Sequence, residues 1–164
     1  MKRIIAIAVL AAAAALLCSS ASAKKKSGTS DKESFHYDVE YVKSAGTGMS
    51  VVRVVSFSTT KMNDDFLSRR NAVHAVIFKG YSGAGATQPA LAKDPDTEYN
   101  NKDFFDKFFA KEGDYSRFVT GVSDYEAIKF GKQHKYSANV TVNVAALRKY
   151  LEQHGIIRSL SSGF

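Results

Sequence analysis

The sequence predicts an α+β fold, a two-layer sandwich in which a mostly antiparallel sheet carries two main helices on one face, together with a short Phe-rich helix. The first observation behind this prediction is that apolar and polar side chains alternate over residues 136–144. A period of two is typical of a strand with one buried and one wet face, and such a sheet is usually antiparallel. The second observation is that the apolar spacing then changes to that of a helix, which must bury its apolar stripe on the sheet.

The N-terminal residues are typical of a secretory signal peptide. A basic start, Lys2 and Arg3, precedes the apolar run 4–17, which is too short to span a membrane comfortably. Small residues follow, and Ala21-Ser22-Ala23 matches the A-x-A cleavage pattern. We expect cleavage after Ala23 and export to the periplasm or the cell surface.

This expectation divides the chain into a signal peptide (1–23), a disordered polar linker (24–34) and a single α+β domain (35–164). Cys18 offers an alternative, because lipidation there would tether the protein to a membrane by acyl chains. It is the only cysteine in the chain, so cleavage after Ala23 leaves none for a disulfide, a catalytic thiol or a thiolate metal site.

The first part of the expected domain reads as a β-hairpin. Residues 35–42 alternate, with Tyr37, Val39 and Tyr41 on one face. A turn rich in small residues follows, and residues 49–58 are β-branched and apolar. Two such runs around a short turn indicate a hairpin of two strands.

A helix is expected over 64–79. Asn63 is expected to cap its N-terminus, and two aspartates suit the positive end of the helix dipole. Gly80 is expected to end the helix, with Tyr81 packing back on Val76.

The middle and the end of the domain contain weaker signals. Residues 81–101 read as a long connection without secondary structure, and such loops are often functional. Residues 103–112 predict a short helix, residues 115–122 and 125–130 two short strands, and residues 156–160 a final edge strand.

The helix after residue 143 carries the clearest end signals in the chain. The Asn143 side chain is expected to accept a hydrogen bond from a first-turn amide. Gly155 is expected at the left-handed position after the last turn, with Ile156 contacting Leu151 in a Schellman motif.

The charge and the polar motifs exclude several kinds of site. The formal net charge is +7, two positive charges of which leave with the leader, and export argues against nucleic acid as a partner. A basic surface suits anionic lipid headgroups or glycans, but a solvated face is the favoured interpretation. No phosphate loop, zinc spacing, EF-hand or G-x-S-x-G motif is present. We therefore expect no enzyme activity, no cofactor, no metal site and no catalytic residue.

Aromatic residues supply the candidate partner or ligand surface. The run at 104–109 is the most unusual feature of the chain, and its rings are either core or an exposed partner site. The candidate surface comprises Tyr81, Tyr99, Phe104, Phe105, Phe108 and Phe109.

Two segments carry a resemblance to known domains. SRRNAVHAVIFKG and the later VTVNVAALRKYLEQHGI resemble the sheet-and-helix domains of bacterial envelope accessory proteins, namely the N-terminal domain of flagellar assembly protein T, small surface lipoproteins and TolB-N-terminal-like domains. The leader and the FDKFF…YSRFV run are similar to exported proteins of Bacteroides. This resemblance implies a role in assembling or supporting envelope machinery without catalysis, and it carries no functional residue across.

Three hypotheses follow. The favoured one is a non-enzymatic envelope interaction or assembly protein that presents residues 81–109, and a sheet edge, to an envelope protein. The alternative is a periplasmic or surface module that binds glycan or peptide, and the third is a hydrolase with an unrecognised site. A membrane is an expected partner only if Cys18 is lipidated.

Overall fold

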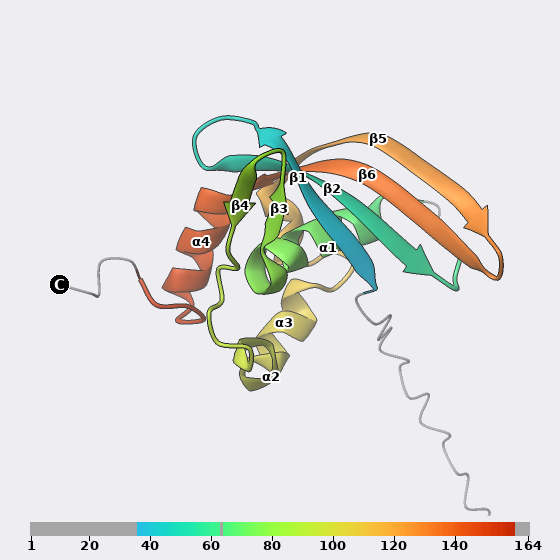
Figure 1. Cartoon of the computed structure of the whole chain (residues 1–164). Helices are drawn as coiled ribbons and strands as arrows, with labels where there is room; N and C mark the ends of the chain where they lie inside the picture. The colour runs from blue at the N-terminus through green and yellow to red at the C-terminus, as the bar shows by residue number, and fades with distance from the viewer. Residues whose placement is uncertain (1–35, 63, 160–164) are drawn as a thin grey trace, which may run out of the picture. The chain divides into compact units, whose positions relative to one another are not determined.

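A four-stranded antiparallel sheet forms one layer of the domain, as Figure 1 shows. The computed structural model describes residues 36–62 and 64–159. The strands β1 (Tyr37–Ser44), β2 (Met49–Ser58), β6 (Gln133–Asn143) and β5 (Val119–Phe130) lie side by side in that order. The fold is α+β, as the sequence predicts, and the predicted β1–β2 hairpin is confirmed.

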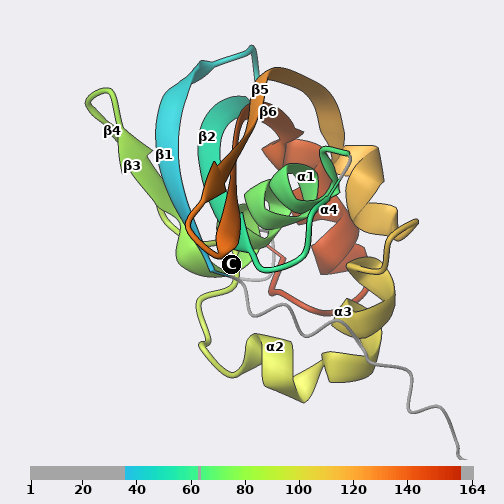
Figure 2. The same cartoon turned by 90° about the vertical axis from the view of Figure 1, so that its right-hand side faces the viewer.

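The helices gather on one face of this sheet (Figure 2). The central helix α1 (Phe66–His74) continues as a π-helical turn, Ala75–Lys79, and packs against β2 and β6. The strand residues that face it are apolar and buried, as the alternation predicts, and include Val52, Val54, Ala138 and Val140. The predicted two-layer arrangement therefore arises from burial of α1 on the two central strands.

The start of α1 differs from the prediction. The residue that precedes its first turn is Asp65, and no side chain accepts a bond at that position. The predicted cap, Asn63, lies outside the described residues. Asp64 instead accepts a bond from the Phe66 amide over 3.3 Å.

The end of α1 is held by the connection that follows it. Gly80 leaves the helix with φ 70°, so the predicted stop is confirmed. The carbonyl oxygens of Val76 and Ile77, which the helix leaves without an internal partner, accept bonds from the amides of Leu91 (3.1 Å) and Ala92 (2.9 Å).

The prediction of a structureless loop over 81–101 was wrong. The chain forms a small hairpin, β3 (Tyr81–Gly83) and β4 (Ala86–Gln88), and then a short helix, α2 (Thr97–Asn100). Tyr81 accordingly lies in a strand, where its ring stacks on that of Tyr41 at 5.9 Å between centroids.

The small hairpin lies against the outer strand β1. A Cβ added at Gly83 would lie 2.6 Å from the Tyr41 carbonyl oxygen, so only glycine permits this approach of the two backbones. The turn at its tip has φ 45° at Ala84 and φ 77° at Gly85, as a type I′ turn requires.

Two further predictions need correction. The Phe-rich helix α3 covers Lys102–Phe108, ending four residues earlier than expected. Residues 114–118 form a 3₁₀ turn instead of a strand, and β5 is a single long strand instead of two short ones. Its pairing with β6 shifts register twice, between Val119 and Gly121 and again around Asp124, where φ is 52°.

The C-terminal helix α4 (Val144–Gln153) is bounded as predicted. The Ala146 amide donates to the Asn143 side chain over 2.9 Å. The amides of Gly155 and Ile156 donate to the carbonyls of Glu152 (3.0 Å) and Leu151 (2.9 Å), which together form the Schellman motif. The predicted edge strand after it is wrong for residues 156–159, which form no strand; residue 160 lies outside the described range.

Replacing the N-cap tests how much the capped helix contributes to stability. We expect Asn143→Ala to lower the free energy of unfolding by about 1 kcal/mol, because a first-turn amide loses its acceptor. Asn143→Asp keeps an acceptor and should stay close to the parent. Urea unfolding of the two variants measures the difference, and equal losses in both would contradict a capping role.

Candidate functional site

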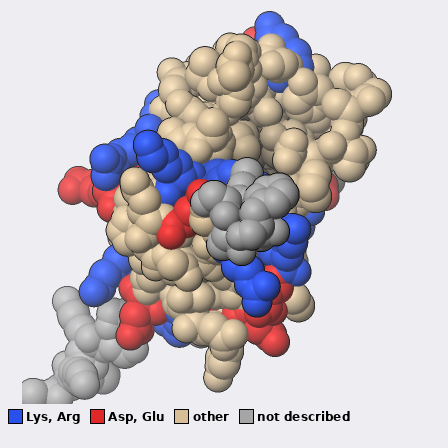
Figure 3. All heavy atoms as spheres, turned by 90° about the vertical axis from the view of Figure 1, so that its left-hand side faces the viewer, with Lys and Arg blue, Asp and Glu red and all other residues tan. Residues whose placement is uncertain are grey.

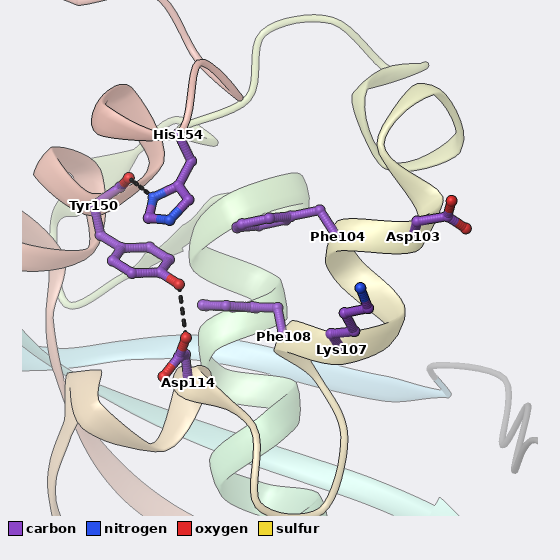
Figure 4. Close-up of a pocket in the computed structure, with 7 residues that line it drawn as sticks. All are labelled: Asp103, Phe104, Lys107, Phe108, Asp114, Tyr150 and His154. Atoms are coloured by element: carbon purple, nitrogen blue, oxygen red, sulfur yellow. Dashed lines mark hydrogen bonds between the residues drawn. The ribbon is translucent and has the colours of Figure 1, made fainter.

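An open hollow of about 410 Å³ lies between α3 and α4, at the edge of the aromatic core (Figure 4). Two ring pairs form its walls. Each pair is spaced four residues apart on its helix, so its rings lie on the same face one turn apart. The residues that line the hollow are Asp103, Phe104, Lys107, Phe108, Asp114, Tyr150 and His154.

The rings from the two helices are packed together. Phe104 stacks on Phe108, with 5.6 Å between ring centroids, and lies 5.5 Å from the ring of His154, the residue that follows α4. Tyr150 and His154 are closer still, at 4.2 Å. Figure 4 shows both Phe rings pointing from α3 toward the two α4 rings, while Asp103 points outward at the rim.

A carboxylate is fixed beside these rings. The Tyr150 hydroxyl donates to Asp114 Oδ2 over 2.8 Å, and Arg117 lies 3.4 Å from Oδ1 of the same carboxylate. The bond from Tyr150 is the main cause of the lowered pKa of Asp114, followed by Arg117. Burial, and then the hydrogen bond to Asp114, raise the pKa of the Tyr150 hydroxyl. Asp114 is therefore a carboxylate and Tyr150 a neutral phenol at neutral pH.

The histidine in the hollow is oriented by its own helix. His154 Nδ1 lies 2.9 Å from the Tyr150 carbonyl oxygen. A carbonyl can only accept, so Nδ1 carries the proton and Nε2 of the neutral ring is left as an acceptor. The hollow thus offers ring faces, a fixed carboxylate and an imidazole acceptor to a ligand.

The predicted surface residues are divided between the core and the exterior. Phe105, Phe108 and Phe109 are buried, as is Tyr81. Phe104 is half-buried in the wall of the hollow, whereas Tyr99 on α2 is 82% exposed and lies outside that wall.

Sequence reasoning missed the α4 half of the hollow and Asp114. Tyr150 and His154 are four residues apart in the sequence, the same spacing as Phe104 and Phe108. No local signal indicates that the two pairs meet, because they are far apart in the sequence.

A second polar cluster lies inside the domain. The Tyr37 hydroxyl lies 2.6 Å from His74 Nδ1, and Glu98 Oε1 lies 3.5 Å from His74 Nε2. Because Nε2 faces a carboxylate, the proton belongs on Nε2 and Tyr37 donates to Nδ1. Lys79 donates to the Tyr37 carbonyl and lies over the Tyr37 ring, 4.2 Å from its centroid.

Burial decides the charge of this cluster. Desolvation lowers the pKa of His74, and Glu98 opposes that shift only partly. Desolvation also raises the pKa of Tyr37. Both groups are neutral at neutral pH, so the cluster ties β1, α1 and the α2 segment together without a buried ion pair.

Comparisons of the chain with protein families, with characterised proteins and with solved structures found no match. Within residues 36–62 and 64–159, no three His, Cys, Asp or Glu side chains are grouped to hold a metal ion. No helix in that part of the chain has the length and apolar character needed to cross a membrane. The resemblance to envelope accessory domains stays a prediction.

The aromatic run is expected to separate into structural and surface positions. Phe105→Ala should lower the free energy of unfolding by about 3–5 kcal/mol, because it leaves a cavity in the core. Phe104→Ala should cost clearly less, since that ring is only partly buried at the edge of the core. Thermal and urea unfolding measure both, and a Phe105 variant as stable as the Phe104 variant would contradict this division.

Stability should fall as the pH falls below about 6.5, the ordinary pKa of histidine. In that range the unfolded chain takes up a proton at His74, while the folded protein, whose His74 pKa is lowered, does not. The loss should level off below the folded pKa.

The measurement is the free energy of unfolding between about pH 5 and pH 7. His74→Gln should flatten its pH dependence, whereas replacing the exposed His36 by Gln should keep the parent slope. An unchanged slope in His74→Gln would show that other groups carry the effect.

Proposed function

We propose that this protein is a non-enzymatic interaction protein of the cell envelope, and that it binds a partner polypeptide through the hollow between α3 and α4. The observation that carries the proposal is the convergence of Phe104, Tyr150 and His154 around the fixed carboxylate of Asp114. The predicted signal peptide supports the location, since its removal leaves a chain that acts outside the cytoplasm.

The size of the hollow favours a small portion of a partner. At about 410 Å³ it is near the lower limit of ligand pockets, and it suits one side chain with its adjoining backbone. A polypeptide that docks one side chain there would be held mainly by ring contacts, with the polar rim selecting its charge.

The chemistry of the hollow favours a basic side chain. Aromatic faces attract cations, and the attraction grows when a carboxylate lies nearby. Arg117 of the protein itself already makes such contacts, with its guanidinium 6.0 Å from the Tyr150 ring centroid and 3.4 Å from Asp114. An arginine of a partner would repeat this arrangement on the opposite wall, against the open side of the Phe104 and His154 rings.

The surface charge around the hollow is compatible with a basic ligand. On the side of the domain seen in Figure 3, Lys and Arg side chains are interspersed with Asp and Glu. A surface of mixed charge exerts little long-range force on a cationic segment. The specificity for a basic side chain must therefore come from the residues that line the hollow.

A glycan is the second candidate, and the pairing of Tyr150 with Asp114 favours it. A sugar ring presents C–H groups that pack on an aromatic face, and hydroxyls that donate to a carboxylate or an imidazole. The two ligand classes differ in charge, so binding assays can separate them.

We expect an arginine-centred tripeptide with blocked ends, Gly-Arg-Gly, to shift the NMR resonances of Phe104, Tyr150 and His154. Gly-Glu-Gly should leave them unchanged, because the carboxylate repels it. Phe104→Ala should weaken binding by about two- to fivefold through the lost cation–π contact. Asp114→Asn should reduce the preference for arginine over glutamate.

Tyr99→Ala serves as the matched control, since it removes an exposed aromatic ring away from the hollow. Shifts caused by N-acetylglucosamine oligomers and not by the peptides would support the glycan. Absence of any shift at the hollow with either class would contradict the proposed function.

A further inference from the structure

The far end of the β5–β6 hairpin is a protruding tip with exposed apolar side chains. Figure 1 shows the hairpin running out beyond the helices that cover the rest of the sheet. Pairing continues to the turn, with Phe130 opposite Gln133 and Ile128 opposite Lys135. Ile128 is 53% exposed and Phe130 63%, among the most exposed large apolar side chains in the described residues.

These side chains form one patch on the face of the sheet that the helices leave uncovered. Ile128 and Phe130 are two residues apart on β5 and therefore point to the same side. Lys135 of β6 pairs with Ile128 of β5 on one side and with Phe57 of β2 on the other. Residues directly opposite each other in a sheet point to the same face, so Phe57 lies on that face too. The rings of Phe57 and Phe130 meet edge to face, 6.3 Å apart.

The charged residues of the tip segment have a single sign. Residues 127–135, AIKFGKQHK, contain three lysines and no aspartate or glutamate. The two acidic residues of β5 precede this segment and bond to β6: Asp124 accepts from Asn139 over 2.6 Å, and Glu126 from Ser137 over 3.3 Å. The lysines of the tip are therefore not neutralised within their own segment.

Exposed apolar side chains at a tip that carries lysines and no acidic residue match the interface of an anionic membrane. Apolar groups enter the boundary between headgroups and acyl chains, while ammonium groups remain among lipid phosphates. A second copy of this chain is a poorer occupant, because a symmetric contact would bring the same lysines together. The charge complementarity thus favours lipid.

We propose that the tip of the β5–β6 hairpin, residues 127–135, inserts Ile128 and Phe130 into the interface of an anionic lipid membrane. This contact is separate from the hollow on the helical side and does not depend on a lipid at Cys18. It would hold the exported protein at a membrane surface while the hollow stays accessible to a partner.

The absence of tryptophan from the chain allows a direct test of insertion. Phe130→Trp places a single tryptophan at the tip, and Tyr99→Trp places one at an exposed site on α2. Both variants, in the exported chain starting at Lys24, are mixed with vesicles of phosphatidylglycerol and phosphatidylcholine, or of phosphatidylcholine alone. We expect a blue shift, and quenching by brominated acyl chains, only for the tip tryptophan and only with the anionic vesicles.

Vesicle flotation measures the contributions of the apolar and basic residues. Ile128→Ser with Phe130→Ser should weaken binding at least about tenfold, as expected for two apolar side chains returned to water. Replacing Lys129, Lys132 and Lys135 with Gln should weaken it by roughly 100-fold, about fivefold for each charge near an anionic surface.

The control variant replaces three exposed lysines elsewhere, Lys93, Lys111 and Lys149, with Gln, which makes the same change in net charge. It should lose much less binding than the tip variant. The basic residues of the linker are present in every variant, so they cannot produce the difference. Thermal melting checks that all variants are folded.

Three results would overturn the proposal. The first is vesicle binding by the tip-tryptophan variant without a blue shift, which indicates adsorption without insertion. The second is an equal loss of binding in the tip and control lysine variants, which indicates an effect of net charge alone. Finally, a blue shift that grows with protein concentration in the absence of vesicles would show that another copy of the chain covers the tip.

Discussion

The structure depends on burying α1 on nearly all sides. The sheet covers one side of the helix, through β2 and β6. Aromatic rings from the α3 region cover another side, with Phe78 against Phe105 at 5.0 Å and Phe66 against Tyr115 at 6.2 Å. A helix enclosed in this way cannot keep a polar face for water, so each of its polar side chains needs a partner inside the domain.

Two hydrogen-bonded pairs join polar side chains of α1 to distant parts of the chain. Asn71 donates to Ser56 of β2 over 2.8 Å, and His74 bonds to Tyr37 of β1. Each pair is possible only when the helix has one rotation and one position along the sheet. The buried polar groups therefore specify how α1 sits, while the apolar contacts supply most of the free energy.

The same packing produces the hollow. Phe105, Phe108 and Phe109 are held in the core, which leaves Phe104 at the outer side of α3. The bond between Tyr150 and Asp114 then links α4 to the turn that follows α3. A site formed by such contacts is preorganised, since its walls belong to the folded core and not to a free loop.

The sequence predicted the elements whose signals are local and missed those that depend on distant partners. The alternation in β1 and β6, the β-branched run of β2, the Asn143 cap and the Schellman ending all lie within a few residues and were confirmed. The β3–β4 hairpin has only three residues in each strand and no apolar alternation, so no periodicity reveals it. The i, i+4 spacing of the aromatic residues can be read from the sequence, but the contact between the two pairs in the fold cannot.

Neither edge strand of the sheet is well suited to pair with a strand of another chain. A free outer strand presents unpaired amides and carbonyls on which another chain can build, the first step toward aggregation. Here the backbone of β3 lies against that of β1 at Gly83, and the two register shifts and the left-handed residue Asp124 distort the outer strand β5. The fold therefore resists edge-to-edge polymerisation.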